Sequence, residues 1–419
     1  MSPEETRGLT RRLTAGALLL AIGIFASPAG ADDSALRIAA DHLVRAQLPS
    51  GLLRYDFDFA AGVPSADDDI VRQAGVAAFM AAYYAETRDP RMRRAVETSL
   101  RTFQALSVPV SNGWWQGLLE TTGVPWVPIG RRTVWHAFDR LGLLYRPHGD
   151  GRVLTIDGTH GSAYVGATAM ALLAELLYSN ASNDDRYRAN RIGWLNGLRA
   201  AHIAGRGFRS TPTNFDESAF YNGEAWLALS DYQRRYRDEA VGRLLNSLDA
   251  YLMRRYRDDL GTGFYQWGTM AAAVRFETTA DRRFLDFIAR QAARALDEAP
   301  WSETRSRNTC AMVEGMATAA GVLSQQPEHS ALAKRVAERA RAEMVKNQRF
   351  QIPLDARRVA LGDGAYLVSR HLDEFAGAYR GGDSSVSTRI DYTGHCLAAM
   401  LKRTDGGHQA ASVASRARR

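Results

Sequence analysis

The chain of 419 residues is 46% hydrophobic and 24% charged, carries a formal net charge of +7 and contains only two cysteines. Its length suffices for a large core, and the absence of a linker rich in proline, glycine and serine favours a single domain. The basic residues are dispersed and no nucleic-acid-binding motif occurs, which argues against a nucleic-acid partner. A basic chain outside the cytoplasm favours an acidic glycan or an anionic membrane surface.

The first 31 residues have the pattern of a targeting segment. Arg7, Arg11 and Arg12 form a basic start, and residues 13–26 form an apolar stretch. Small residues follow, so we expect cleavage after Ala31; an uncleaved N-terminal anchor is the alternative. We therefore predict a signal peptide at 1–31, a catalytic domain at 32–404 and a disordered tail at 405–419. The mature chain is expected in the periplasm or outside the cell, with no later transmembrane helix.

Six stretches are rich in alanine and glycine and apolar on all faces, which is typical of helices buried all round. Each begins with or directly follows a polar or aromatic cluster, such as residues 67–69 or 389–392, and has a glycine within its first two turns. In chain order they are 70–84, 159–178, 219–232, 268–276, 309–323 and 393–401.

Between these stretches lie six segments in which apolar residues recur at intervals of three, four and seven. That spacing gives one apolar stripe and one solvated face, as in an amphipathic helix. These segments are 35–48, 91–106, 184–202, 237–256, 280–296 and 331–344. The chain therefore alternates a striped helix with a fully apolar helix, six times over.

The simplest packing of this alternation is two concentric rings, with the striped helices outside. Helices joined by short connections are antiparallel, so the inner helices all point the same way. This pattern resembles the (α/α)6 barrels of the six-hairpin carbohydrate-active enzymes, and the resemblance covers the whole mature chain. We predict an all-α (α/α)6 double-ring barrel with short β-hairpin insertions, placed at 107–157 and 348–388. The first insertion contains Trp114, Trp115 and Trp126.

If the inner helices share a direction, their starts form a cup at one end of the barrel. Carboxylates, aromatic rings and a few bases gathered there suit a sugar site, because paired carboxylates do acid and base work at a glycosidic bond. We predict three catalytic carboxylates, Asp69, Glu217 and Asp391. The predicted substrate-binding residues are Asp68, Arg72, His160, Tyr221, Glu224, Trp267, Asn308, Glu314, Tyr392 and His395.

Structural roles compete with these assignments. Asp68, Asp216 and Asn308 stand where helix N-caps are expected. Asp69 and Arg72, three residues apart, can form a plain ion pair. Trp267 is more typical of a core residue, and His160 and His395 of satisfied polar groups. Glu217 and Glu224 are seven apart and fit one helix face, where Glu224 would be the deeper, buried charge.

The two cysteines, Cys310 and Cys396, fall near the starts of the fifth and sixth inner stretches. A disulfide between neighbouring helices and two buried free thiols both fit this placement. A zinc site of Cys396 with His395 and His160 is a further alternative. We expect neither a metal nor a cofactor.

The predicted function is a secreted or periplasmic glycoside hydrolase acting on an oligosaccharide or polysaccharide, acidic glycans included, as a monomer. A uronate lyase or epimerase on the same barrel is the first alternative, with chemistry by Tyr221, Tyr392, His395, Arg305 and Asn308. The sequence around His160 also looks a little like the start of a helix in lanthionine cyclases, but that family's tryptophan-cysteine-glycine string is absent. The last alternative is a non-catalytic glycan-binding envelope protein.

Overall fold

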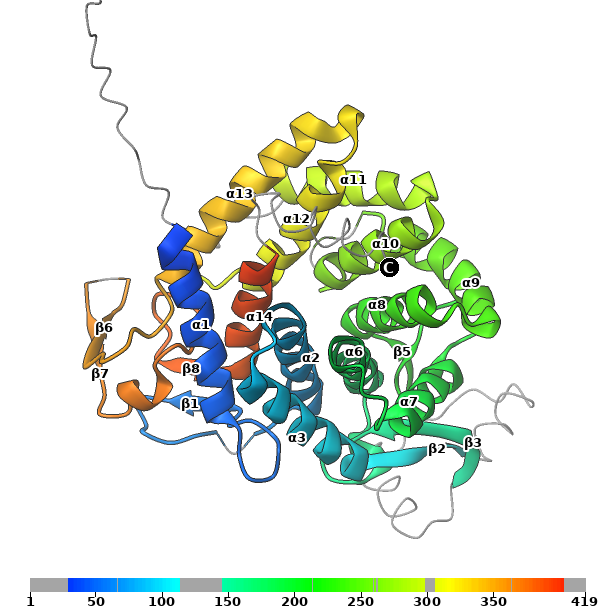
Figure 1. Cartoon of the computed structure of the whole chain (residues 1–419), viewed down its shortest axis with the longest axis horizontal. Coiled ribbons are helices and arrows are strands. Elements are labelled where there is room, and N and C mark those ends of the chain that lie inside the picture. Colours follow the sequence, from blue (N-terminus) through cyan, green and yellow to red (C-terminus); the bar gives the residue numbers. More distant parts are fainter. Residues whose placement is uncertain are drawn as a thin grey trace, which may run out of the picture.

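The computed structural model describes residues 29–65, 67–113, 145–212, 214–258, 260, 263–297, 306–362 and 364–402. Within these ranges twelve α-helices form two concentric rings (Figure 1). The outer ring consists of α1 (Ala29–Ala46), α3 (Pro90–Leu106), α7 (Arg188–Ala201), α9 (Glu239–Arg255), α11 (Arg282–Asp297) and α13 (Ser330–Gln348). The inner ring consists of α2 (Ile70–Thr87), α6 (Val165–Ser182), α8 (Ala219–Tyr236), α10 (Phe264–Thr279), α12 (Cys310–Leu323) and α14 (Ile390–Leu401). The predicted (α/α)6 barrel is confirmed.

The two rings differ because their helices bury different fractions of their surface. In α6, fourteen of the 18 residues are buried, and alanine and glycine let neighbouring helices approach closely. In α11 the buried positions recur every three or four residues, from Phe284 to Ala295, and leave a polar face for solvent. Contacts from α2 to α6, α8, α10, α12, α14 and back to α2 close the inner ring.

Short turns connect each inner helix to the outer helix that follows, and four of them share one conformation. The residue after the inner helix is left-handed at Arg88, Asn183, Arg237 and Ala280, with φ between 50° and 60°. In all four the next residue is an aspartate, and the side chains of Asp89, Asp238 and Asp281 accept N–H groups at the start of the outer helix. This turn is a structural repeat that the helical spacing did not predict.

Replacing Ala280 by glycine is expected to stabilise the fold, because a left-handed backbone is unfavourable for every residue with a Cβ. Ala280 has φ 56°. The gain in free energy of unfolding should be about 0.5 to 1 kcal/mol, measured by urea denaturation. The control, Ala337→Gly inside α13, should lose about 1 kcal/mol. A loss in both variants would contradict the assigned turn.

Within the described residues every strand belongs to a connection from an outer to an inner helix, and the β1–β8 pair joins two such connections. The strands are β1 (Asp56–Asp58), β2 (Ser107–Gly113), β3 (Tyr145–Leu154), β4 (Arg209–Thr211), β5 (Asn214–Glu217), β6 (Arg358–Ala360), β7 (Tyr366–Val368) and β8 (Ser387–Arg389). They pair antiparallel as β1–β8, β2–β3, β4–β5 and β6–β7. Short 3-10 helices lie in two of these connections, at His160–Ser162 and Leu372–Phe375, and a third, Pro327–His329, lies in the turn from α12 to α13. Because the inner helices begin where these connections end, the insertions and the inner N-termini share one end of the barrel.

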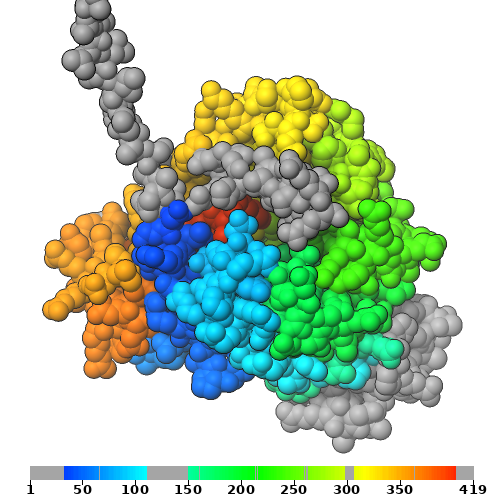
Figure 2. Space-filling model, in the orientation of Figure 1, coloured from blue at the N-terminus to red at the C-terminus, as the bar shows by residue number. Residues whose placement is uncertain are grey.

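The second insertion forms a small lobe with its own apolar core. Phe57 and Phe59 pack there with Ile352, Leu372 and Phe375. The lobe lies against the N-terminal helix, and the orange and blue segments adjoin in Figure 2. Two hydrogen bonds join them: Arg45 donates to the carbonyl of Ala376 at 2.6 Å, and Gln351 donates to that of Ala35 at 2.9 Å.

Cys310 and Cys396 form a disulfide that ties the start of α12 to the second turn of α14. This decides between the pairing and the free thiols that the sequence left open. It also removes Cys396 from any zinc site, because a disulfide sulfur carries no thiolate to bind the metal. Within the described ranges no group of three His, Cys, Asp or Glu residues could hold a metal ion.

Removing the disulfide is expected to lower the free energy of unfolding by about 2 to 4 kcal/mol, because it closes a loop across 86 residues. The double variant Cys310→Ser with Cys396→Ser should unfold at lower urea concentration than the oxidised protein. The wild type unfolded in a reductant serves as the control and should match the variant. Identical midpoints for oxidised and reduced protein would contradict the prediction.

Three predicted features lie wholly or mostly outside the described residues: the export segment, the tryptophans of the first insertion and the tail. The described chain begins at Ala29, so most of the export segment lies outside it, and the expected cleavage point after Ala31 lies in the first turn of α1. The tryptophans of the first insertion and the tail at 405–419 also lie outside. No helix in the described part of the chain is long and apolar enough to cross a bilayer.

Candidate active site

The N-terminus of α2 presents the first carboxylate of the site. Asp69 is the N-cap residue: its Oδ1 accepts the backbone N–H of Val71 at 2.8 Å and that of Arg72 at 3.2 Å. Its Oδ2 accepts the Arg72 guanidinium at 2.7 Å, so the ion pair expected from the sequence is present. Asp68, which the sequence offered as a cap, accepts the side-chain amide of Gln73 at 2.9 Å instead.

Arg72 links the start of α2 to the start of α14. Its Nε lies 3.3 Å from Asp391, and its Nη1 donates to the hydroxyl of Tyr55 at 2.5 Å. Asp391 also receives two hydrogen bonds from Arg389, at 2.6 and 2.7 Å. Two predicted catalytic aspartates, Asp69 and Asp391, are therefore joined through one guanidinium. Fixed in this way, they hold their positions without a ligand.

Glu224 lies in the second turn of α8 and is the buried carboxyl of the site. Glu224 is only 4% exposed, and its Oε2 has no hydrogen-bond partner among the described residues. A Cβ added at Gly166 of α6 would lie 2.3 Å from that oxygen. The absence of a side chain at Gly166 therefore makes the room that Glu224 occupies.

The charge state of Glu224 follows from this burial. Removal from water disfavours the ionised form, and the negative charge of Asp69 adds to the effect; together they raise the pKa of Glu224 to about 8. Tyr221 lies close to both carboxyls, and burial raises its pKa as well. The ring of Tyr221 lies 6.2 Å from that of Tyr164. A carboxylic acid that keeps its proton at neutral pH thus lies near an aspartate held by a cation.

The raised pKa has a consequence for stability. Folded protein keeps the Glu224 proton up to about pH 8, whereas the unfolded chain releases it near the ordinary value of 4.5. Between these values the folded state binds more protons, so stability falls as pH rises, by about 1.4 kcal/mol per pH unit for one group.

We therefore expect the wild type to lose about 2 to 3 kcal/mol more than Glu224→Gln between pH 5 and 7, because glutamine does not titrate. Urea denaturation of both proteins at each pH measures the difference. Parallel curves for the two proteins would show that Glu224 titrates at its usual pKa.

The structure places Glu217 in a different group of side chains. It is the last residue of β5, before α8 begins, and accepts hydrogen bonds from Arg206 at 2.7 Å, Asn222 at 2.9 Å and Tyr251 at 3.0 Å. Tyr251 belongs to the outer helix α9, so these contacts tie Glu217 to the outer ring, and it makes no hydrogen bond or ion pair with Asp69 or Glu224 among the described residues. Asp216, beside it, is exposed.

A second buried carboxylate, Glu314 of α12, joins three inner helices. It lies 3.3 Å from His395 and 2.8 Å from Lys402, both on α14 or at its end, and it accepts the side-chain amide of Gln266 of α10. Burial opposes its ionisation, but Lys402 and His395 outweigh burial and hold the pKa of Glu314 below its usual value. Lys402 and Gln266 were not among the predicted residues.

The remaining predicted residues divide between the site and the framework. Tyr392 lies under the guanidinium of Arg389, at 4.4 Å from the ring centroid. Trp267 is buried and stacks on Phe79 at 6.0 Å, a core position. Asn308 accepts the backbone N–H of Cys310 at 3.0 Å, as a helix cap does. The side chain of His160 and residue Arg305 lie outside the described part of the structure.

Comparison with known proteins places the fold but not the family. No family model matches the chain, and no curated protein matches its sequence. Among solved structures, the chain is similar to an α-1,6-mannanase of glycoside hydrolase family 76 from Salegentibacter sp. HEL1_6, with a TM-score of 0.57, 11% identity and coverage of 89% of this chain and 98% of that one. It is also similar to a sugar epimerase from a ruminal bacterium, with a TM-score of 0.55, 11% identity and coverage of 90% and 98%.

A third similar structure is an unsaturated glucuronyl hydrolase specific for heparin, with a TM-score of 0.54, 10% identity and coverage of 88% and 96%. The mannanase is also known as an inactive variant in complex with α-1,6-mannotetraose, in which two consecutive aspartates are replaced. At these identities the likeness shows a shared fold, the (α/α)6 barrel of carbohydrate-active enzymes.

Proposed function

We propose that this chain is a glycoside hydrolase in which Glu224 is the general acid and Asp69 the general base. The single observation that carries the proposal is the pairing of a buried, protonated carboxyl with an anchored carboxylate near the starts of α2, α6 and α8. Hydrolysis of a glycosidic bond needs these two states together, one group to protonate the leaving oxygen and one to activate water. In this proposal Glu224, and not the Glu217 predicted from the sequence, is the catalytic glutamate.

Each neighbouring group has a role under this proposal. Arg72 holds Asp69 and Asp391 in fixed positions, and Asp391 with Arg389 closes the α14 side of the site. The half-buried rings of Tyr55, Tyr164 and Tyr392 offer faces for pyranose rings. The complex of the similar mannanase with α-1,6-mannotetraose supports a glycan as substrate, and the two aspartates replaced in that variant are consecutive, as Asp68 and Asp69 are here.

We also propose, from the basic and apolar start of the chain, that the enzyme acts in the periplasm or outside the cell. The substrate is then an envelope or extracellular polysaccharide, and the chain acts as a monomer.

A second candidate function is a sugar epimerase, because His395 lies against the buried Glu314 and Gln266, a pairing that fits proton transfer at a sugar carbon.

One assay separates these functions. Purified protein is incubated with a panel of oligosaccharides that includes α-1,6-mannooligosaccharides, neutral glucans and uronate polymers. A hydrolase releases new reducing ends, a lyase gives an unsaturated product that absorbs in the ultraviolet, and an epimerase changes the sugar without cleaving it. Binding of a glycan with none of these products would overturn the proposal in favour of a non-catalytic glycan-binding protein.

A further inference from the structure

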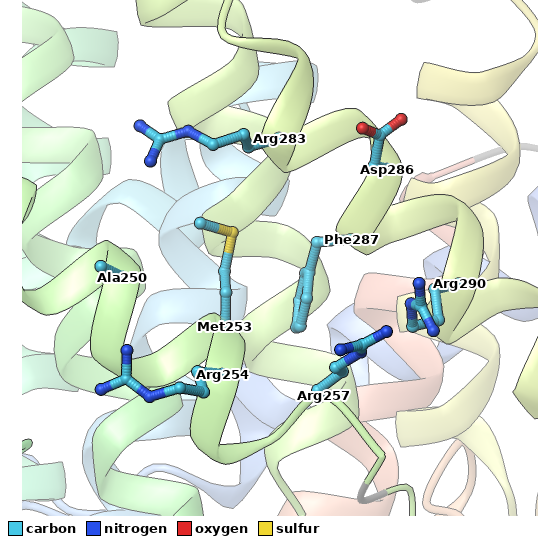
Figure 3. A pocket seen from close by; sticks show the side chains of 8 residues that line it. All are labelled: Ala250, Met253, Arg254, Arg257, Arg283, Asp286, Phe287 and Arg290. Atoms are coloured by element: carbon cyan, nitrogen blue, oxygen red, sulfur yellow. The ribbon is translucent and has the colours of Figure 1, made fainter.

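A groove runs along the outer wall of the barrel between α9 and α11 (Figure 3). One wall is a face of α9 continued into the turn that follows it, and the other is a face of α11, each with the spacing i, i+3, i+4 and i+7. The groove has a volume of about 370 Å³ and is lined by Ala250, Met253, Arg254 and Arg257 on one wall and Arg283, Asp286, Phe287 and Arg290 on the other. These eight residues are called the arginine groove below.

The floor of the arginine groove is apolar and its rim is charged. Met253 and Phe287 lie side by side in the middle of Figure 3, and Phe287 is buried. The four arginines surround them and are all exposed. The half-buried Met253 leaves an apolar floor accessible beneath the cationic side chains, which can bind the acidic groups of a ligand.

The charge of the arginine groove is largely uncompensated. Four arginines face a single carboxylate, that of Asp286. Arg283 is paired with Asp281 at 2.6 Å, whereas Arg254, Arg257 and Arg290 have no ion pair with any residue in the described ranges. Neighbouring cations that lack carboxylate partners attract an anionic ligand, and planar guanidinium groups bind carboxylate or sulfate through paired hydrogen bonds.

We propose that the arginine groove binds a segment of an acidic polysaccharide that carries carboxylate or sulfate groups. Arg283 and Arg290 are two helical turns apart, about 10 Å along the helix axis. Positive charges therefore recur along the groove, which suits a ligand with repeated negative charges. The groove is shallow and open to solvent, so a chain-like polymer can lie across its arginines. The site lies on the outer ring, away from Asp69 and Glu224, so binding here does not depend on the proposed hydrolysis.

The test compares three polymers with the same backbone: dextran, carboxymethyl-dextran and dextran sulfate. Affinity is measured for the full chain near 150 mM salt. We expect the two charged polymers to bind and neutral dextran not to bind. The double variant Arg257→Gln with Arg290→Gln should bind the charged polymers at least tenfold more weakly.

A matched control removes the same charge elsewhere on the outer ring. Arg243 and Arg335 are exposed to 67% and 62%, so Arg243→Gln with Arg335→Gln should change affinity less than twofold. Turnover of short substrates should be the same in both double variants. Equal weakening in the two variants would overturn the proposal, as would binding to vesicles of anionic lipid in place of the polymers. A failure of the proposed hydrolysis would leave this binding result unchanged.

Discussion

Replacing Glu224 by glutamine is expected to lower kcat on a natural glycan by about 10²- to 10⁴-fold. Glutamine has nearly the same shape and fits the space beside Gly166, but its amide cannot give a proton to the leaving oxygen. A substrate with an activated aryl leaving group needs no such proton, so the variant should keep most of its activity there. Steady-state kinetics on the two substrates measure the difference.

The pH profile supplies an independent readout of the same assignment. Because burial raises the pKa of Glu224 to about 8, wild-type activity on the natural glycan should fall above that pH as the acid loses its proton. The residual activity of Glu224→Gln should lack this fall. A merely structural role for Glu224 would lower activity on both substrates equally and leave the profile unchanged.

Glu217→Gln is the matched control, since it makes the same chemical change at the carboxylate that the sequence favoured. Glu217 is held by Arg206, Asn222 and Tyr251, and its loss should change kcat by less than about threefold. A large loss in Glu217→Gln with little effect in Glu224→Gln would restore the original assignment and contradict the proposed pair.

The order of helices could be predicted from the sequence because it depends on a single property, the number of apolar faces. Stretches such as 159–178 are apolar all round and became inner helices, whereas stretches such as 280–296 have one stripe and became outer helices. The common end of the inner N-termini followed from antiparallel pairing through short turns. These inferences average over many residues, so one misjudged position does not alter them.

The individual site residues depended on helix boundaries, which are far less certain. Glu217 and Glu224 share a face only if both are helical, but α8 begins at Ala219, and Glu217 belongs to the preceding strand. The cap of α2 lies at Asp69 and not at Asp68, a shift of one residue. Lys402 lies two turns beyond His395, at the end of α14, so no signal at the start of a helix could identify it.

Replacing Asp69 by asparagine is expected to separate its chemical role from its structural one. Asparagine caps helices about as well as aspartate, so the N–H groups of Val71 and Arg72 keep their acceptor and the free energy of unfolding should change by less than about 1 kcal/mol. The amide cannot accept a proton from water, so kcat should fall by about 10²- to 10⁴-fold. Urea denaturation and steady-state kinetics measure the two effects.

Asp89→Asn is the control, because Asp89 caps α3 and pairs with Arg91 much as Asp69 caps α2 and pairs with Arg72. Its stability change should match that of Asp69→Asn while kcat stays at the wild-type value. Asp69→Asn should also move the alkaline fall of residual activity to lower pH, since the Asp69 charge helps to raise the pKa of Glu224. An unchanged pH profile would show that the carboxyls of Asp69 and Glu224 do not interact. Equal losses of kcat in Asp69→Asn and Asp89→Asn would show that Asp69 acts only as a helix cap.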